Sequence, residues 1–365
     1  MAVNDRRINI SDLDFDDIKE NLKVFLKGQT EFKDYDFEGS GMNILLDTLA
    51  YNTHYLSFNA NMLANEMFLD SASLRSSITS HAKTLGYEVG SARSPIATVN
   101  VSLTTDSSTK TMPAGTAFST TVDDVSYQFV TIADVTSNNN GGVVSFDSTK
   151  IYEGTYVTTK FLVDTSDIEQ RFLLGNDRAD TSTLTVQVQT SASDSTTTTY
   201  TKATDITQLS STSTVYYLQE VDAGRFEVYF GDGIVSRGLS DGNIVTMQYV
   251  VTNKTLSNGA SSFSAPSLID GVSDITITTV ASASGGAEPE SLNSIKLQAP
   301  LDYASQGRAV TSDDYAVYAR KLFPNTQAVS VFGGEDGSFD PSLGVSSTPE
   351  YGKVFISIKS TTGLN

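Results

Sequence analysis

The sequence predicts an α+β protein of several domains: an N-terminal helical bundle with one long helix, a central β-rich domain, and a C-terminal α/β segment. Changes in the spacing of apolar residues lead to this prediction. Apolar residues recur at helical spacing to about residue 90, alternate with polar residues from residue 94, and return to a mixed pattern after residue 281. We therefore expect domains over residues 1–92, 93–281 and 282–365.

The composition argues against several classes of protein. The 365 residues include 43 Asp and Glu against 24 Lys and Arg, a net charge of −19, and such a surface repels nucleic-acid phosphates and anionic membranes. Cysteine is absent, so no disulfide or thiolate metal site can form, which suits assembly in a reducing cytoplasm. The sequence shows neither a secretory signal nor a run of about 18 apolar residues. We expect no cofactor, no nucleic-acid or membrane partner, and no small-molecule substrate.

The first helix is expected to begin after Ser11 or Asp12, either of which can cap it, and to end at Gly28. Acidic residues fill its first turn, where the helix macrodipole favours negative charge. Its apolar stripe consists of Ile18, Leu22, Phe25 and Leu26.

The second helix, from about Met42 to Leu69, carries the longest regular pattern in the chain. Its apolar positions advance by alternate steps of four and three residues, as in a heptad repeat. We call this set the leucine seam: Met42, Leu46, Leu49, Thr53, Leu56, Ala60, Leu63 and Met67. A third helix is expected from about Ser73 to Leu85, with Gly86 as its stop.

The leucine seam has two interpretations. In the first, three helices form an intramolecular bundle, and the spacing alone favours this because globular bundles use it. In the second, the seam packs against another subunit. Leu49, Leu56 and Leu63 lie seven residues apart on one side of the helix, so the second interpretation predicts that a single chain leaves them exposed.

A β domain is expected from residue 94, where Ala97, Val99, Val101 and Leu103 alternate with polar residues. Residues 138–142, Asn-Asn-Asn-Gly-Gly, are expected to form a loop. The Thr/Ser-rich stretch 191–201 is either a hairpin tip or an exposed strand.

The β domain is expected to end in a hairpin over residues 225–251. Its first strand is Phe226 to Phe230 and its second is Ile244 to Val251. Gly231, Asp232 and Gly233 break the first strand, because glycine tolerates positive φ and aspartate can bond its own backbone. We expect these three residues to have an architectural role.

The C-terminal segment is expected to contain two helices and two strands. One helix starts at Glu288-Pro289-Glu290 and runs to Pro300, since proline and glutamate favour a first turn. The other is capped by Thr311 with Asp314 and ends at Pro324. Strands are expected at residues 329–332 and 354–358, and the segment looks begun but unfinished, as a truncated ring-forming domain would.

Catalytic and metal-binding patterns give no enzyme prediction. His54 and His81 lie on helices without metal-ligand spacing, so packing roles are favoured. Each pair of acidic residues that could serve glycoside hydrolysis also has a role at a helix start or in a loop, and tryptophan is absent. These pairs are Asp313 with Asp314, Glu288 with Glu290, and Asp336 with Asp340. The loop from Gly334 to Asp340 lacks EF-hand spacing, so a solvated loop is favoured over a Ca²⁺ site.

Three segments resemble signatures of the baseplate J-like family: F-G-D-G from Phe230 with D-G-x-I-V from Asp241, G-G-A-x-x-E from Gly285, and R-A-V-T-x-x-D-Y from Arg308. Members of that family are wedge subunits of contractile phage tails, and the helical N-terminus is similar to those of T-even-like phages. The resemblance does not extend to the Thr/Ser-rich middle of the chain.

The resemblance implies a structural, non-enzymatic subunit of the virion tail baseplate. Such a subunit assembles with itself around a sixfold axis and with other wedge proteins, through its C-terminal segment and through its N-terminal helices, which join a multi-chain bundle. On this basis the interface hypothesis consists of Met42, Leu46, Leu49, Leu56, Leu63 and Met67. The alternative is a secreted carbohydrate-binding or adhesive β protein, which the Thr/Ser-rich strands would suit but the long seam helix would not.

Overall fold

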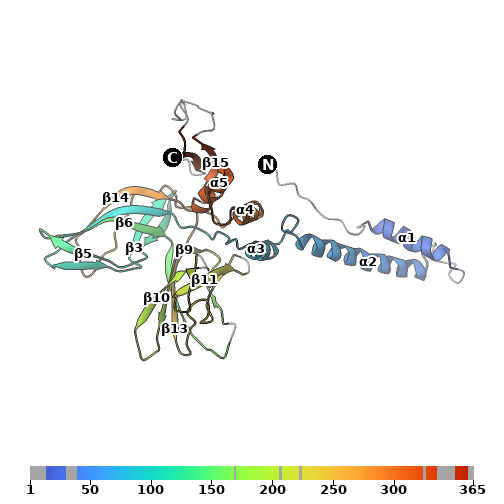
Figure 1. Cartoon of the computed structure of the whole chain (residues 1–365), viewed down its shortest axis with the longest axis horizontal. Helices are drawn as coiled ribbons and strands as arrows, with labels where there is room; N and C mark the ends of the chain where they lie inside the picture. Colours follow the sequence, from blue (N-terminus) through green and yellow to red (C-terminus); the bar gives the residue numbers. More distant parts are fainter. Residues whose placement is uncertain are drawn as a thin grey trace. The chain divides into compact units, whose positions relative to one another are not determined.

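The computed structural model describes residues 14–29, 39–167, 170–204, 208–221, 224–323, 326–334 and 350–360. The chain divides into two compact units, Met1–Leu85 and Gly86–Asn365, and each is described by itself. Helices form the first unit, and two large sheets followed by a helical and stranded segment form the second (Figure 1). This confirms the predicted α+β architecture. The predicted boundaries at residues 92 and 281 remain predictions.

The first unit contains α1 (Phe15–Lys27), α2 (Gly41–Glu66) and α3 (Arg75–Thr84). Helix α1 is capped by Asp14, whose Oδ1 accepts a hydrogen bond from Asp16 N at 2.8 Å. The prediction that Ser11 or Asp12 caps this helix was therefore wrong, and both residues lie outside the described part of the chain. Ser40 caps α2 by accepting from Asn43 N at 3.1 Å.

The N-terminus of α3 is capped by a side chain from the end of α2. Leu74, at the N-cap position of α3, makes no side-chain capping hydrogen bond itself. Glu66 accepts hydrogen bonds from Ser73 N at 2.8 Å and from Leu74 N at 3.2 Å. Partial burial acts to raise the pKa of the Glu66 carboxyl, but these bonds outweigh it and lower the pKa. His81 Nε2 lies 2.9 Å from the Glu66 carbonyl oxygen, which fits the predicted packing role of that histidine.

The second unit contains two seven-stranded sheets, in which every strand pair is antiparallel except β10 with β11. The first sheet has the order β14-β1-β6-β4-β3, with β5 pairing β2 and β6. Its strands are β1 (Ile96–Thr104), β2 (Thr109–Met112), β3 (Ala117–Val122), β4 (Val125–Val130), β5 (Val135–Asn140), β6 (Val143–Glu153) and β14 (Ile275–Ser284).

The second sheet has the order β7-β13-β9-β10-β11-β12-β8. Its strands are β7 (Thr155–Leu162), β8 (Phe172–Leu173), β9 (Ala179–Gln189), β10 (Thr197–Lys202), β11 (Val215–Glu220), β12 (Phe226–Phe230) and β13 (Ile244–Val251).

Each sheet has a core of its own. The first is built on the alternating buried residues of β1 with Phe118, Phe129 and Phe146, and the second on residues such as Phe226 and Met247. These side chains are essentially inaccessible to water, so each sheet buries its apolar face without help from a partner.

The predicted hairpin over residues 225–251 was wrong. Strand β12 pairs with β11 and β8, whereas β13 pairs with β7 and β9, so three strands separate them. The loop explains the difference, because Gly233 N bonds Ser236 O at 2.9 Å and turns the chain locally. Asn243 then binds the ends of β9 and β7, donating to Thr190 O and accepting from Val163 N. Strand β14 follows and returns to the first sheet.

The Thr/Ser-rich stretch forms a hairpin tip and an interior strand. Residues 191–196 connect β9 to β10, and Thr190 N bonds Thr196 O at 3.0 Å across the tip. Strand β10 then lies between β9 and β11, where Tyr200 enters the core. The loop predicted at 138–142 is confined to Gly141 and Gly142, because Asn138 to Asn140 continue β5 and pair with neighbouring strands.

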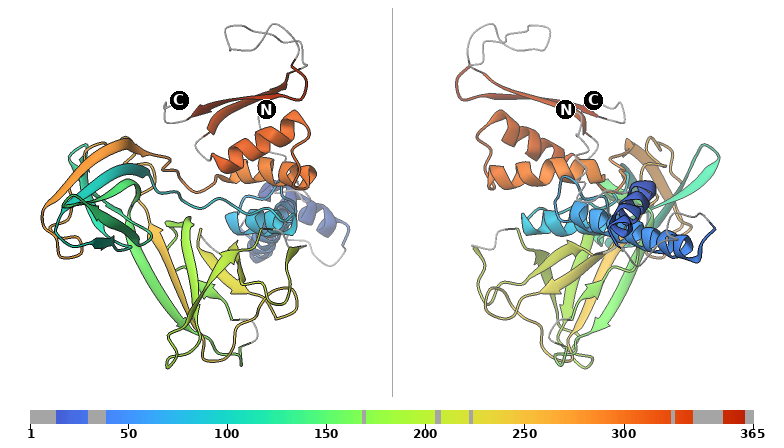
Figure 2. Two further views of the ribbon diagram at one scale, coloured as in Figure 1. Left: turned by 60° about the vertical axis from the view of Figure 1, so that its left-hand side comes forward. Right: turned by 90° about the vertical axis from the view of Figure 1, so that its right-hand side faces the viewer.

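The C-terminal part contains α4 (Leu292–Ser305), α5 (Ser312–Leu322), β15 (Thr326–Gly333) and β16 (Val354–Ser360). Both expected strands are present and form an antiparallel pair, which packs on α5 as a separate layer (Figure 2). The predicted capping box of Thr311 and Asp314 is present, with bonds of 3.2 and 2.8 Å.

Helix α4 does not begin or end where the sequence predicted. Ser291 caps it, so Glu288, Pro289 and Glu290 precede it, and Glu290 instead binds the segment near Tyr87. Pro300 lies inside the helix, which continues to Ser305. Packing on both sides of the proline, at the buried residues Ala299 and Ser305, explains why it does not end the helix.

Candidate assembly surfaces

Helix α2 exposes most of its leucine seam. Leu49, Leu56 and Leu63 are 53%, 61% and 71% exposed, and Met67 is exposed as well. Leu46 is buried and Met42 is half-buried, so these two members pack within the chain. An intramolecular three-helix bundle would cover the three leucines, and the structure does not cover them. Their role as an interface remains a prediction.

A second heptad pattern lies on another side of α2, and the sequence analysis missed it. Ile44, Tyr51 and Phe58 lie seven residues apart, as do Tyr55 and Met62, and all five side chains are exposed. We call these residues the tyrosine seam. At 100° per residue, its mean direction is roughly 160° from that of the leucine seam. The seven-residue spacing of these residues is present in the sequence, but only the leucine seam was identified from it.

The tyrosine seam contains an ordered aromatic pair. The rings of Tyr51 and Tyr55 meet edge to face with centroids 4.7 Å apart, and their hydroxyls lie 3.0 Å apart. The hydrogen bond to Tyr55 raises the pKa of the Tyr51 hydroxyl. Tyrosines with an apolar body and a polar tip are enriched at protein interfaces. Exposed apolar area of this extent is typical of an interaction surface.

The turn Gly231-Asp232-Gly233 is held by its own backbone. Asp232 Oδ1 accepts from Ile234 N at 2.9 Å and from Val235 N at 3.4 Å, and these bonds lower the pKa of the carboxyl. Gly233 has φ of 85°, which favours glycine. A Cβ on Gly231 would overlap the buried Ser236, with the carbonyl oxygen of that serine only 2.7 Å away. These contacts support an architectural role, which remains a prediction.

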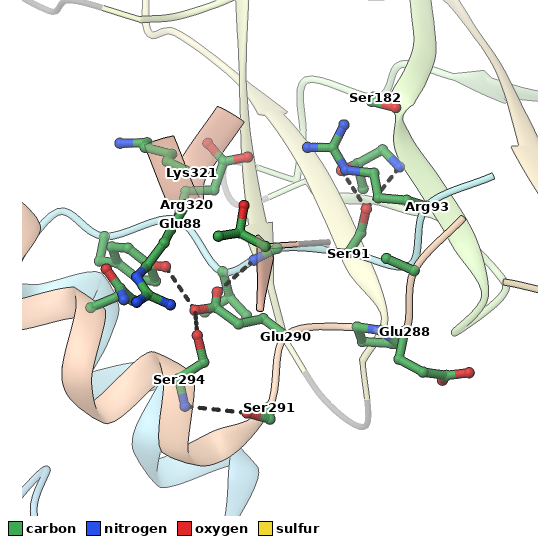
Figure 3. Close-up of a pocket in the computed structure, with 18 of the residues that line it drawn as sticks. Glu88, Ser91, Arg93, Ser182, Glu288, Glu290, Ser291, Ser294, Arg320 and Lys321 are labelled. Atoms are coloured by element: carbon green, nitrogen blue, oxygen red, sulfur yellow. Dashed lines mark hydrogen bonds between the residues drawn. The ribbon is translucent and has the colours of Figure 1, made fainter. Parts of the chain in front are cut away.

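The G-G-A-x-x-E segment forms a clasp between two distant parts of the second unit (Figure 3). The Glu290 carboxylate accepts hydrogen bonds from Tyr87 OH at 2.8 Å, Ser294 Oγ at 2.7 Å and Gly90 N at 3.1 Å. Burial, and then the nearby Glu290 charge, raise the pKa of Tyr87 far above its usual value. Sequence reasoning assigned Glu290 to a helix start, because nothing in the local pattern reveals a partner 200 residues away.

The surroundings of Gly286 explain why this segment needs a glycine at that position. A Cβ at this position would overlap the Lys254 carbonyl oxygen and the Pro95 ring. Asn258 fixes the backbone there, accepting from Gly286 N and donating to Gly286 O, both at 3.0 Å. The motif is therefore a close backbone crossing followed by a carboxylate clasp.

Three of the candidate catalytic acids have structural partners. Asp314 belongs to the capping box, Glu288 pairs with Lys254 at 2.6 Å, and Glu290 forms the clasp. Asp313 lies beside Asp314 in the first turn of α5. Asp336 and Asp340, with the rest of the candidate Ca²⁺ loop after Gly334, lie outside the described residues.

Within the ranges that the structure describes, no group of three or more His, Asp or Glu side chains could hold a metal ion. In the same ranges, no helix combines the length and apolar character that a membrane span requires.

Three family models, all of gp6-like proteins of the phage baseplate, match successive parts of the chain. Residues 14–87 match the helical domain of gp6-like baseplate wedge proteins. Residues 161–260 match the third domain of the bacteriophage baseplate wedge protein gp6, and residues 311–365 match C-terminal domain I of the baseplate structural protein gp6. The second match includes the Thr/Ser-rich stretch that the family resemblance had not covered.

The chain is similar to the baseplate wedge protein gp6 of Enterobacteria phage T4. The two are 30% identical over an alignment of 347 residues that covers 87% of this chain and 51% of the T4 protein. The chain thus spans about half the length of this relative. The matches support the wedge assignment predicted from the sequence, although the matching models carry the gp6 designation and not the baseplate J-like one.

Proposed function

We propose that this chain is a non-enzymatic structural subunit of a contractile-tail baseplate wedge, and that it is assembled into the virion through α2. The exposed leucine seam is the observation that carries this proposal. Full burial of a leucine side chain contributes about 1.5–3 kcal/mol, so a partner that covers Leu49, Leu56 and Leu63 would stabilise the contact strongly. Partners are other wedge proteins, further copies of the chain, or both.

The two seams fit two partner helices. Each seam has heptad spacing, and their directions differ too much for one straight helix to cover both. A bundle of at least two added helices around α2 is therefore the arrangement that we propose. The same proposal includes three further points: kinship to the baseplate J-like family, the sixfold arrangement, and an assembly role for residues 1–92. The alternative of a carbohydrate-binding protein gains no support from the matched domains.

The test replaces one seam leucine and measures assembly. Leu56→Asp places a carboxylate where the partner would exclude water, and an unpaired buried charge costs about 3–5 kcal/mol, or more than 100-fold in affinity. Co-expression with the neighbouring wedge proteins, followed by purification on a tag, measures the loss. The matched control is Asn59→Asp, which adds the same charge at an exposed position outside both seams.

Two outcomes would contradict the proposal. Wild-type recovery of the complex by the Leu56→Asp chain would show that the leucine seam is not the contact. Hydrolysis of peptidoglycan or polysaccharide by the pure chain, abolished by an Asp or Glu substitution, would show that the protein is an enzyme.

A further inference from the structure

A groove of about 720 Å³ lies in the second unit beside the Glu290 clasp (Figure 3). Its walls come from residues 87–93, from the ends of β9, β10 and β11, and from helices α4 and α5. Apolar side chains such as Leu184 and Val317 form part of the wall, and charged groups form the rest.

Each acidic side chain on the wall has an ion-pair or hydrogen-bond partner in the structure. Glu88 pairs with Lys202 at 2.5 Å, and Glu288 pairs with Lys254 at 2.6 Å. Glu290 accepts the three hydrogen bonds of the clasp. Lys202 and Lys254 thus neutralise Glu88 and Glu288, whereas Glu290 is held by neutral donors and keeps its negative charge.

Three other polar side chains on the wall lack partners in the described part of the chain. Arg93 Nε is buried without a hydrogen bond, and Arg320 forms no hydrogen bond or ion pair with a described residue. Gln298 is only 7% exposed, and its Oε1 is likewise unsatisfied. The two arginines lie on either side of Glu290 in Figure 3. Leaving the buried Arg93 Nε and Gln298 Oε1 unpaired costs about 1–3 kcal/mol each, so their arrangement favours an occupant that satisfies them.

The unsatisfied groups specify the chemistry of that occupant. Guanidinium groups bind carboxylates through paired, charge-assisted hydrogen bonds. An unsatisfied amide oxygen needs a hydrogen-bond donor, and the N–H groups of a peptide backbone supply one. We propose that this groove binds an extended acidic peptide segment of a partner subunit. Arg93 and Arg320 hold its carboxylates, and Gln298 accepts one of its backbone N–H groups.

This inference rests on the proposed function in one respect: the peptide is taken to come from a second tail protein. The groove lies in the second unit and both seams lie on α2 in the first, so the two contacts can be tested separately. The Leu56→Asp chain is expected to bind the peptide as the wild-type chain does.

The experiment is fluorescence anisotropy with the full chain and two labelled probes, an octapeptide of alternating Ser and Glu and the same peptide with Gln for Glu. The Glu peptide is expected to bind at least about tenfold more tightly than the Gln peptide. Arg93→Gln and Arg320→Gln should each weaken the Glu peptide about tenfold, with unchanged circular dichroism. The control Arg171→Gln removes an arginine that stacks 4.4 Å above the Tyr229 ring, outside the groove, and should change nothing.

Three results would overturn the inference. Equal binding of the two peptides would remove the role of the carboxylates. If Arg171→Gln weakened binding of the Glu peptide as much as Arg320→Gln does, the loss would come from the change in net charge alone. Displacement of the peptide by an equal concentration of inorganic phosphate would show a simple anion site. If Arg93→Gln fails to fold, Arg320→Gln on α5 still decides the question.

Discussion

The sheets of the second unit and helix α2 of the first unit differ in how much apolar side-chain area they leave exposed to water. In the second unit, the side chains of Phe226, Met247 and Tyr249 are closed off from water by the rest of their own sheet. In the first unit, α2 leaves Leu56, Leu63 and their neighbours in water. A fold that needs its apolar area for its own stability buries it, so the exposed area on α2 is better explained by a partner.

The largest expected effect tests the second unit. Phe226→Ala removes a ring that is 2% exposed and should cost about 3–5 kcal/mol of unfolding free energy. Chemical denaturation followed by circular dichroism measures this loss. A cost below about 1 kcal/mol would mean that the sheet is not a tightly packed core and would remove the contrast with α2.

Much of this contrast could be predicted from the sequence. Period-two alternation located β1, and heptad spacing identified Leu49, Leu56 and Leu63 before their exposure was known. Strand pairing was not predictable, because β12 and β13 adjoin in the sequence while the sheet inserts three strands between them. The Glu290 clasp was hidden for the same reason, since its partners near Tyr87 are set by tertiary packing and not by local pattern.

The next effect concerns the turn that ends β12. Gly231→Val should cost about 2–3 kcal/mol, because its side chain would overlap buried Ser236. Gly233→Val should cost about 1–2 kcal/mol, from its positive φ alone, since no atom lies close to its Cβ position. Thermal melting ranks the two. Loss of wedge assembly with unchanged melting would instead make the turn an interface and extend the exposed surface into the second unit.

A buried tyrosine gives the second unit a pH dependence of its own. Burial, and then the charge of Glu88, raise the pKa of Tyr216 to about 12. Because the folded pKa exceeds the unfolded value of 10.0, this contribution is fully present below pH 10 and is lost as pH rises towards 12. The unfolding free energy lost in this way amounts to about 2–3 kcal/mol by pH 12.

Tyr216→Phe should therefore flatten the fall of stability between pH 10 and pH 12, while leaving stability at pH 7 nearly unchanged. Denaturation midpoints for the second unit across this range provide the measurement, with exposed Tyr303→Phe as the control. An identical fall in both variants would show that Tyr216 ionises as freely as an exposed tyrosine.

The smallest expected effect is on α2 in the free chain. Leu63→Ala should change the unfolding free energy by no more than about 0.5 kcal/mol, because its side chain is 71% exposed. The same variant should weaken wedge assembly clearly. A large loss of stability in the free chain would mean that α2 depends on Leu63 for its own packing.

Amide hydrogen exchange of α2 in the free chain and in the assembled wedge tests the central claim most directly. The account predicts that residues 49–63 exchange readily in the free chain and become strongly protected in the wedge, while β13 is equally protected in both. Equal protection of α2 in the two states would contradict the account, because the helix would then owe its stability to its own chain.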